Sequence, residues 1–338
     1  MKQDPHLCLN RIDSKIDLRI YCFRMYIHKF NIIFLFSRDL NRQMKYLLDK
    51  SSSYFDFFEN HWNNKKTKSI IWFIIVISFI LLGFAIEINK IFLSGTFNLP
   101  SDLFYSINFV FNLILFYEMI DLIFIMSKSF SIAISKQMEI YSLILVRDSF
   151  KLVSDVSNEN IFLNYNEGFN LFNIFDILIK SDLFVMIFSI FGAIIVYILI
   201  LKFKESYSRS EEIKKNEDID LFILIKKAIS LVHLFVVLTF LVWIYIDTDN
   251  ESDKITNLLS LFFLSLIYVD ILHLLISYYF SKDYNLVFRN SSFSANTLLL
   301  RFSINTTPIL GIFIGIISNL LLVLTIIYYN KNKNHIEK

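Results

Sequence analysis

The chain has 338 residues, of which 55% are hydrophobic and 19% are charged, and its mean hydropathy is +0.53. This composition excludes an ordinary soluble domain and predicts an integral membrane protein whose first partner is the lipid bilayer. The net charge of +2 argues against a nucleic-acid partner, and the only cysteines, Cys8 and Cys22, cannot build a disulfide framework or a cysteine-based metal site.

Residues 1–68 are rich in Lys and Arg, which predicts a basic cytoplasmic tail. The apolar stretch 18–36 is interrupted by charged side chains and has no small-residue cleavage site after it. We therefore expect an interfacial amphipathic helix there and not a signal peptide. Met25 and Met44 are alternative start positions, and with a start at Met44 most of residues 1–43 has no role.

Six later segments are apolar over about 20 residues, the length that crosses the hydrocarbon core as a helix. They cover residues 70–88, 103–126, 183–201, 221–246, 258–280 and 309–329. Two further segments, 131–146 and 293–305, are apolar but short, and they contain the charged residues Lys136, Glu139 and Arg301. Hydropathy alone does not decide whether these two cross the membrane.

The charges in the loops favour one arrangement, because short cytoplasmic loops carry an excess of Lys and Arg. With six spans, the basic loop 202–220 lies outside and the acidic turn 247–253 lies inside, and both placements break this rule. If segment 131–146 also crosses, the loop 202–220 lies inside and the turn 247–253 lies outside, and both placements agree with the rule. A crossing at 293–305 then puts the basic tail 331–338 inside as well.

We therefore predict an all-α, polytopic membrane bundle of about eight membrane segments, two of them short, tilted or re-entrant, with both termini in the cytoplasm. The alternative is six spans related as inverted repeats. In the eight-segment arrangement, residues 69–201 and 221–330 form two transmembrane repeats. The charged cytoplasmic linker 202–220 separates them, and the basic tail 331–338 follows.

The two predicted repeats share a local pattern of charge. In the first, an acidic stretch that starts at Tyr117 is followed 30 residues later by Arg147. In the second, an acidic stretch that starts at Tyr268 is followed 33 residues later by Arg301. Each half thus has a carboxylate on its second segment and a lone arginine on its third.

Buried charges of opposite sign stabilise one another, so we predict a pair in each half. Arg147 is expected to pair with Asp121 or Glu118, and Arg301 with Asp270. In this hypothesis the carboxylates bind an ion or relay protons, and the two arginines are fixed counter-ions. The alternative is that both pairs only fix the register of packed helices.

Asp270 and His273 carry the stronger signal, because they lie three residues apart and so share one face of a helix near the middle of an apolar segment. A carboxylate at that depth costs about 2.5 to 3.5 kcal/mol on an insertion scale, so it marks a functional site by default. A carboxylate beside an imidazole is a common element of proton relays. We therefore predict an ion-binding or proton-relay site at Asp270 and His273.

Other polar and small residues are expected to serve helix packing or placement. His233 either joins this site or donates a hydrogen bond to a neighbouring helix. Lys226 and Lys227 are expected to anchor their helix at the membrane interface. Gly311 and Gly315, spaced four residues apart, predict a close contact between helices.

Sequence motifs for common chemistry are absent. The chain has no H-E-x-x-H, no G-x-S-x-G and no G-x-x-x-x-G-K-[ST] motif, and it has only six glycines and six histidines. We therefore predict that the protein is not an enzyme and that it needs no cofactor and no metal ion.

Three parts of the chain resemble an uncharacterised group of bacterial multi-pass inner-membrane proteins. They are YEMIDL at 117–122, SKQMEIYSLILVRDSFK at 135–151, and VFRNS at 287–291 with LLLRFS at 298–303. The resemblance covers about residues 70–330 and implies a bacterial plasma membrane, but it supplies no catalytic residues. The layout is also superficially similar to insect gustatory receptors, which are ligand-gated cation channels, although Tyr328-Tyr329-Asn330 stands where their aromatic-glutamine ending would be.

Two classes of function follow from these observations. In the first, the protein is a channel or secondary transporter for a small ion, linked to protons, that uses the buried carboxylates. In the second, it is a non-conducting membrane scaffold or assembly partner, and the buried charges specify helix packing only. A chemoreceptor-like channel is a minor third alternative, and the oligomeric state is left open.

Overall fold

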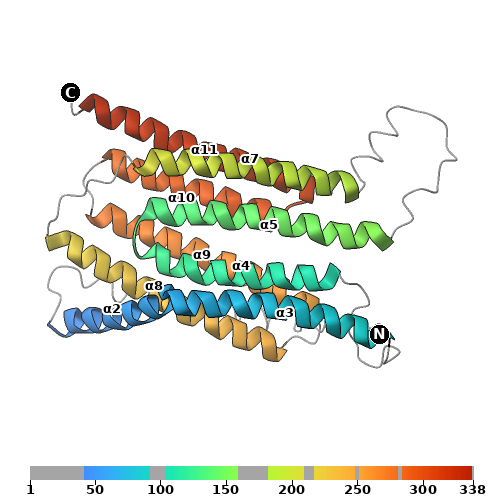
Figure 1. Cartoon of the computed structure of the whole chain (residues 1–338). Helices are drawn as coiled ribbons and strands as arrows, with labels where there is room; N and C mark the ends of the chain where they lie inside the picture. The colour runs from blue at the N-terminus through green and yellow to red at the C-terminus, as the bar shows by residue number, and fades with distance from the viewer. Residues whose placement is uncertain are drawn as a thin grey trace, which may run out of the picture. The chain divides into compact units, whose positions relative to one another are not determined.

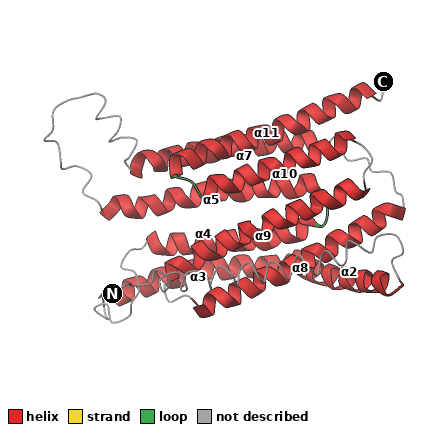
Figure 2. Ribbon diagram, turned by 180° about the vertical axis from the view of Figure 1, so that it is seen from behind, coloured by secondary structure: helices red, strands yellow, loops and turns green. Residues whose placement is uncertain are grey.

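The computed structural model of the chain describes residues 42–91, 104–158, 182–208, 217–247, 251–280 and 284–336. These residues form helices, with described turns at 127–129 and 305–307, and no strand occurs among them (Figures 1 and 2). The nine helices described are α2 (Arg42–Asn63), α3 (Lys65–Ile91), α4 (Phe104–Met126), α5 (Phe130–Asn158), α7 (Asp182–Ser208), α8 (Glu217–Asp247), α9 (Glu251–Phe280), α10 (Tyr284–Ile304) and α11 (Pro308–Ile336). The predicted all-α class is confirmed. Residues 51–338 form one compact unit.

Six of these helices are long and apolar enough to cross a membrane. The candidate spans are Lys65–Asn89, Tyr105–Met126, Leu183–Tyr207, Asp220–Ile244, Leu258–Phe280 and Pro308–Asn332. They coincide with the six apolar segments predicted, and most of their large side chains on the outer surface are apolar. The chain is therefore a multi-pass integral membrane protein.

The two ambiguous segments, 131–146 and 293–305, belong to the helices α5 and α10. α5 has 29 residues and α10 has 21, so at about 1.5 Å per residue they are about 43 and 31 Å long. Neither helix is interrupted. The helices are therefore not short: polar residues at the edges of the two segments hide the true helix length from a hydropathy window, while a tilted or re-entrant course stays a prediction. The number of helices that cross the bilayer and the internal repeat stay predictions.

α5 lies in the interior of the bundle. It packs against α4, α7, α10 and α11, and Figure 1 shows it between α4 and α7. Each residue from 130 to 149 is buried or half-buried. A helix with so little outer surface can hold polar side chains without exposing them to lipid, which explains its low hydropathy.

α10 has its polar side inward and its apolar side outward. Its buried residues include Asn290, Ser294, Asn296, Thr297, Arg301 and Ser303. Its exposed large side chains are apolar, among them Phe288, Leu298, Leu299 and Phe302. This distribution is the reverse of an amphipathic helix on a soluble protein, and it suits a helix with one side toward hydrocarbon.

The helices α4 and α5 form an antiparallel hairpin around a short turn at 127–129 (Figure 1). The C-terminal end of α11 lies at the same end of the bundle as this turn (Figure 1). That end also holds Lys128 of the turn and Lys331 of α11. We call it the basic end.

The predicted close contact at the glycines of α11 is confirmed. Tyr141 of α5 lies against this stretch, and its hydroxyl donates a hydrogen bond to the carbonyl of Gly311 at 3.1 Å. A Cβ atom built at Gly315 overlaps the ring of Tyr141, so only glycine leaves room for it there. Around this contact, large apolar side chains of α5, α7, α10 and α11 form a continuous core that includes Phe203 and Phe293.

Helix α2 was not predicted from the sequence. In its part from residue 51 onward, Phe55 is fully buried with its ring 5.6 Å from that of Phe124 on α4. Asp56 pairs with Lys227 of α8 at 2.8 Å. The part of the predicted basic tail after residue 50 is therefore docked on the bundle. The predicted interfacial helix over 18–36 lies outside the described residues.

Candidate functional site

The predicted pair of Asp270 and Arg301 is present in the structure. Asp270 lies on α9 and is 3% exposed, and Arg301 lies on α10 and is 4% exposed. The Nη2 atom of Arg301 donates to Oδ2 of Asp270 at 2.5 Å. A contact this close between two buried groups compensates both charges within the protein.

Two neutral side chains complete the surroundings of this pair. Gln137 of α5 accepts a hydrogen bond from Arg301 Nη2 at 3.0 Å and places its own amide nitrogen 3.5 Å from each carboxylate oxygen of Asp270. Thr297 of α10 donates to Asp270 Oδ2 at 3.1 Å. The site thus joins three helices, of which α5 comes from the first predicted half and the other two from the second.

The local sequence of α10 explains how its groups reach this site. Asn290, Ser294, Thr297 and Arg301 are spaced by four, three and four residues, which places them on one face of the helix. That face meets α9, where Asn290 donates to the hydroxyl of Ser277 at 2.6 Å. The spacing could have placed Thr297 on the same face as Arg301, and so near Asp270, from the sequence.

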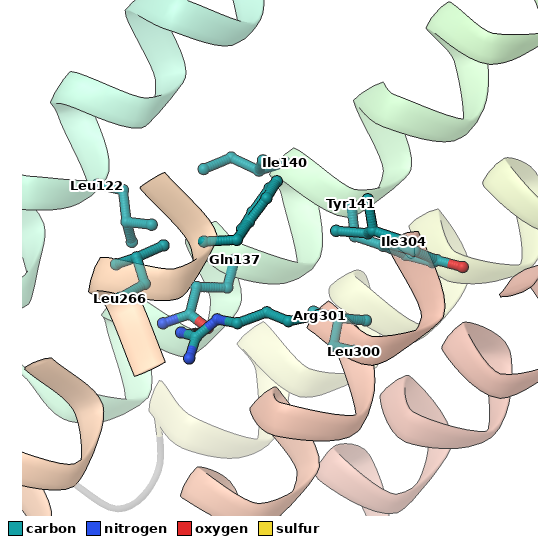
Figure 3. A pocket seen from close by; sticks show the side chains of 9 residues that line it. Leu122, Gln137, Ile140, Tyr141, Leu266, Leu300, Arg301 and Ile304 are labelled. Carbon is teal, nitrogen blue, oxygen red and sulfur yellow. Dashed lines mark hydrogen bonds between the residues drawn. The ribbon is translucent and has the colours of Figure 1, made fainter. Parts of the chain in front are cut away.

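A small cavity lies beside Arg301 and Gln137 (Figure 3). The rest of its lining is mostly apolar and comprises Leu122, Ile140, Tyr141, Phe263, Leu266, Leu300 and Ile304. Its volume is about 10 Å³, measured over positions of a water-molecule centre, which is room for one water molecule. The Nη1 atom of Arg301 is buried and has no hydrogen-bond partner among the described residues. One guanidinium nitrogen is therefore left without a partner beside the pair.

His273 is also buried, at 3% exposure, but it makes no hydrogen bond with Asp270. Neither of its ring nitrogens has a partner among the described residues. His273 therefore lies three residues from Asp270 on α9 but takes no part in the hydrogen bonds of the Asp270 site.

His233 makes the interhelical hydrogen bond that was one of its two predicted roles. Its Nε2 atom lies 2.9 Å from the hydroxyl of Ser265 on α9, and its ring stacks on Phe262. Lys226 departs from its predicted role as an interface anchor: it is 3% exposed, and its ammonium donates to the carbonyl of Lys128 at 3.1 Å.

The predicted pairing of Arg147 with Glu118 or Asp121 is wrong. Both carboxylates pair with Lys136 of α5, the second at 3.1 Å. Arg147 instead lies 3.7 Å from the carboxylate of its neighbour Asp148. The hairpin explains the difference, because residues at similar distances from the turn lie opposite each other, and Arg147 is much farther from the turn than the two carboxylates.

The Lys136 contacts extend into a chain of ion pairs. Its ammonium also lies 3.4 Å from Glu139, and Glu139 pairs with Lys204 of α7 at 2.5 Å. These side chains are partly exposed, unlike the Asp270 site. The described residues contain no group of three or more His, Cys, Asp or Glu side chains disposed to hold a metal ion.

No protein-family model, no curated protein and no solved structure matches this chain. The Asp270 site is thus characterised by its own geometry. It consists of a buried carboxylate, a buried guanidinium whose Nη1 atom has no partner among the described residues, and two neutral hydrogen-bonding groups at the junction of three helices.

Proposed function

We propose that the protein is a secondary transporter for a small ion, coupled to protons, in which Asp270 takes up and releases the proton. One observation carries this proposal: the most buried carboxylate of the described helices is held by side chains from both predicted halves, Gln137 from one and Arg301 from the other. In transporters built from repeated halves, the binding site lies at the interface of the halves near the middle of the membrane.

Protonation of Asp270 gives the pair two states. With the carboxylate charged, Arg301 is bound to it and the charges cancel. With the carboxylate protonated, Arg301 loses its counter-ion while Gln137 remains as its partner. A buried cation without a counter-ion is costly, so the protonated state favours entry of an anion or movement of Arg301. Such a change links a proton to a second ion.

We further propose that α3, α4, α5, α7, α8, α9, α10 and α11 all cross the plasma membrane of a bacterium, with both termini in the cytoplasm. The lengths of α5 and α10 and the apolar outer side of α10 support crossing by these two helices. The lysines at the basic end of the bundle support a cytoplasmic location for that end.

A reporter experiment tests this orientation. A cytoplasm-active reporter fused after Lys215 is expected to be active, and an outside-active reporter at the same position is expected to be silent. The same pair of fusions between α8 and α9, after Asn250, should give the opposite result. An outside location for the Lys215 fusion would contradict the eight-segment arrangement and leave six spans.

Transport is tested with the purified protein in liposomes that contain a pH-sensitive dye. Under an imposed potassium diffusion potential, the unaltered protein is expected to move protons, and Asp270→Asn is expected to abolish this flux while the protein stays folded. Asp56→Asn is the matched control, because Asp56 belongs to a partly exposed ion pair with Lys227 far along the chain from the site. Its flux should equal that of the unaltered protein.

The second candidate is a non-conducting scaffold, and the tight packing around Asp270 favours it. The carboxylate of Asp270 is already paired with Arg301, and the cavity beside the pair has room for one water molecule only. A scaffold would show no flux in any variant. Asp270→Asn would then lower the thermal stability by leaving Arg301 uncompensated.

A further inference from the structure

An open groove lies at the start of α3, the helix that follows α2 after Asn64. The groove has a volume of about 410 Å³ and is lined by Lys65, Lys66, Ser69 and Ile70. This volume is within the range of roughly 300 to 1,000 Å³ that is typical of ligand sites. Both lysines are exposed, so the groove offers two ammonium groups and one hydroxyl to a ligand from outside the bundle. We call it the lysine groove.

The lysines at this groove have no acidic partner. Asp56 and Glu59, the two carboxylates that precede them on the docked part of α2, pair with lysines of α8 and of the α4–α5 turn at 2.8 and 2.6 Å. Lys65, Lys66 and Lys68 form no ion pair within the described part of the chain. The start of α3 therefore carries uncompensated positive charge, which attracts anions.

An apolar stripe continues from the groove along the outer side of α3. Its side chains are spaced by three or four residues and are 36–65% exposed: Ile70, Phe73, Ile77, Ile80 and Phe84. Lys66 lies four residues before Ile70 and so begins the same stripe. At 1.5 Å per residue the stripe is about 21 Å long, which exceeds the roughly 15 Å of hydrocarbon in one leaflet. A hydrocarbon chain can therefore lie along α3 below the groove.

Aromatic side chains of α2 mark the depth of the groove in the membrane. Tyr54, Phe57 and Phe58 share the outer side of α2 and are 40–66% exposed, whereas Phe55 is buried against α4. Exposed aromatic residues gather at the level of the lipid headgroups, where interfacial helices also lie. The lysine groove follows directly on this helix, so it lies at the level of the lipid phosphates.

We propose that the lysine groove binds the phosphate of an anionic phospholipid, with one acyl chain along the apolar stripe of α3. Lys65 and Lys66 donate charge-assisted hydrogen bonds to the phosphate oxygens, and the hydroxyl of Ser69 is a third donor. Each lysine near an anionic surface contributes a factor of about five in binding. A zwitterionic lipid carries an ammonium group beside its phosphate, which repels the lysines. This site does not depend on the transport proposal.

Quenching of tryptophan fluorescence by brominated lipids tests the site. Trp72 lies seven residues after Lys65 on the same side of α3 and is 44% exposed, and Trp243→Phe removes the tryptophan of α8. In liposomes of unbrominated phosphatidylcholine, brominated phosphatidylglycerol is expected to quench the remaining fluorescence at about a fivefold lower mole fraction than brominated phosphatidylcholine. Lys65→Gln with Lys66→Gln in the same background should abolish this preference.

Lys202→Gln with Lys331→Gln is the matched control. It removes two exposed lysines outside the groove, from the ends of α7 and α11, which a hydrogen bond from Asn330 to the carbonyl of Ser206 at 2.6 Å holds together at the basic end. This variant should keep the full preference for phosphatidylglycerol. An equal loss in both double variants would overturn the site, because the attraction would then belong to the whole basic end.

Two further results would also overturn the proposal. One is equal quenching by the two brominated lipids in the Trp243→Phe protein. The other is loss of the preference on addition of excess inorganic phosphate, which would make free phosphate the ligand of the groove. Should the double glutamine variant not fold, Lys66→Gln alone is compared with Lys202→Gln alone, and only the former should weaken the preference.

Discussion

Arg301→Met is expected to lower the free energy of unfolding by about 3 to 5 kcal/mol, because it leaves the carboxylate of Asp270 buried without a cation. Asp270 is only 3% exposed, so water does not replace the guanidinium. The remaining partners, Thr297 and Gln137, are neutral and do not compensate a full charge. The measurement is the midpoint of unfolding in detergent by heat or denaturant.

A double variant identifies the origin of this loss. Arg301→Met combined with Asp270→Asn removes both charges, so it is expected to be more stable than Arg301→Met alone, although its two changes are made in contact and do not add. Lys204→Met is the control, because Lys204 is 45% exposed in its pair with Glu139 and its loss should cost at most about 1 kcal/mol. A loss of this small size in Arg301→Met would contradict the role of the pair.

Gly315→Ala is expected to cost about 1 to 3 kcal/mol, the usual range for overpacking in a well-packed core. The added methyl group overlaps the ring of Tyr141, and this ring is held by its hydrogen bond to the carbonyl of Gly311. Either the hydrogen bond breaks or α5 and α11 move apart. Unfolding midpoints measured in detergent report the loss.

Gly83→Ala is the matched control, since a Cβ at Gly83 meets no atom within 4 Å. It should be neutral, or stabilising by up to about 1 kcal/mol, because alanine restricts the unfolded chain and favours the helix. In a Tyr141→Ala background, the cost of adding Gly315→Ala should largely vanish, because the ring that the methyl group overlaps is no longer there. Equal stability of Gly315→Ala and Gly83→Ala would mean that α5 and α11 are not closely packed at Gly315.

The charge pairs show how much of the site could be predicted from the sequence. Asp270 and Arg301 could be paired in advance, because each is a lone strong charge in an apolar segment of the same half. The prediction for the first half is wrong because it rests on the similarity of Arg147 to Arg301. In the α4–α5 hairpin, Lys136 lies opposite Glu118 and Asp121 and pairs with both.

Neutral and interior features were harder to foresee. Gln137 carries no charge, so nothing in a single sequence distinguishes it as a partner of Asp270 and Arg301. The true lengths of α5 and α10 were hidden for a related reason: hydropathy measures affinity for lipid, and these two helices turn much of their surface to other helices. The six helices that are long and apolar enough to span a membrane, by contrast, were all predicted from composition.

The low apolarity of α5 and α10 has a consequence for biosynthesis. Membrane insertion machinery selects segments by their own apolarity, and an arginine or lysine near the middle of a segment lowers its chance of leaving the aqueous channel alone. α5 and α10 are not among the six helices that are apolar enough by themselves. α5 follows α4 after a turn at 127–129, and α10 follows α9 closely. Each is therefore expected to enter the bilayer as half of a pair with the helix before it, so that assembly of the bundle begins while the ribosome is still translating.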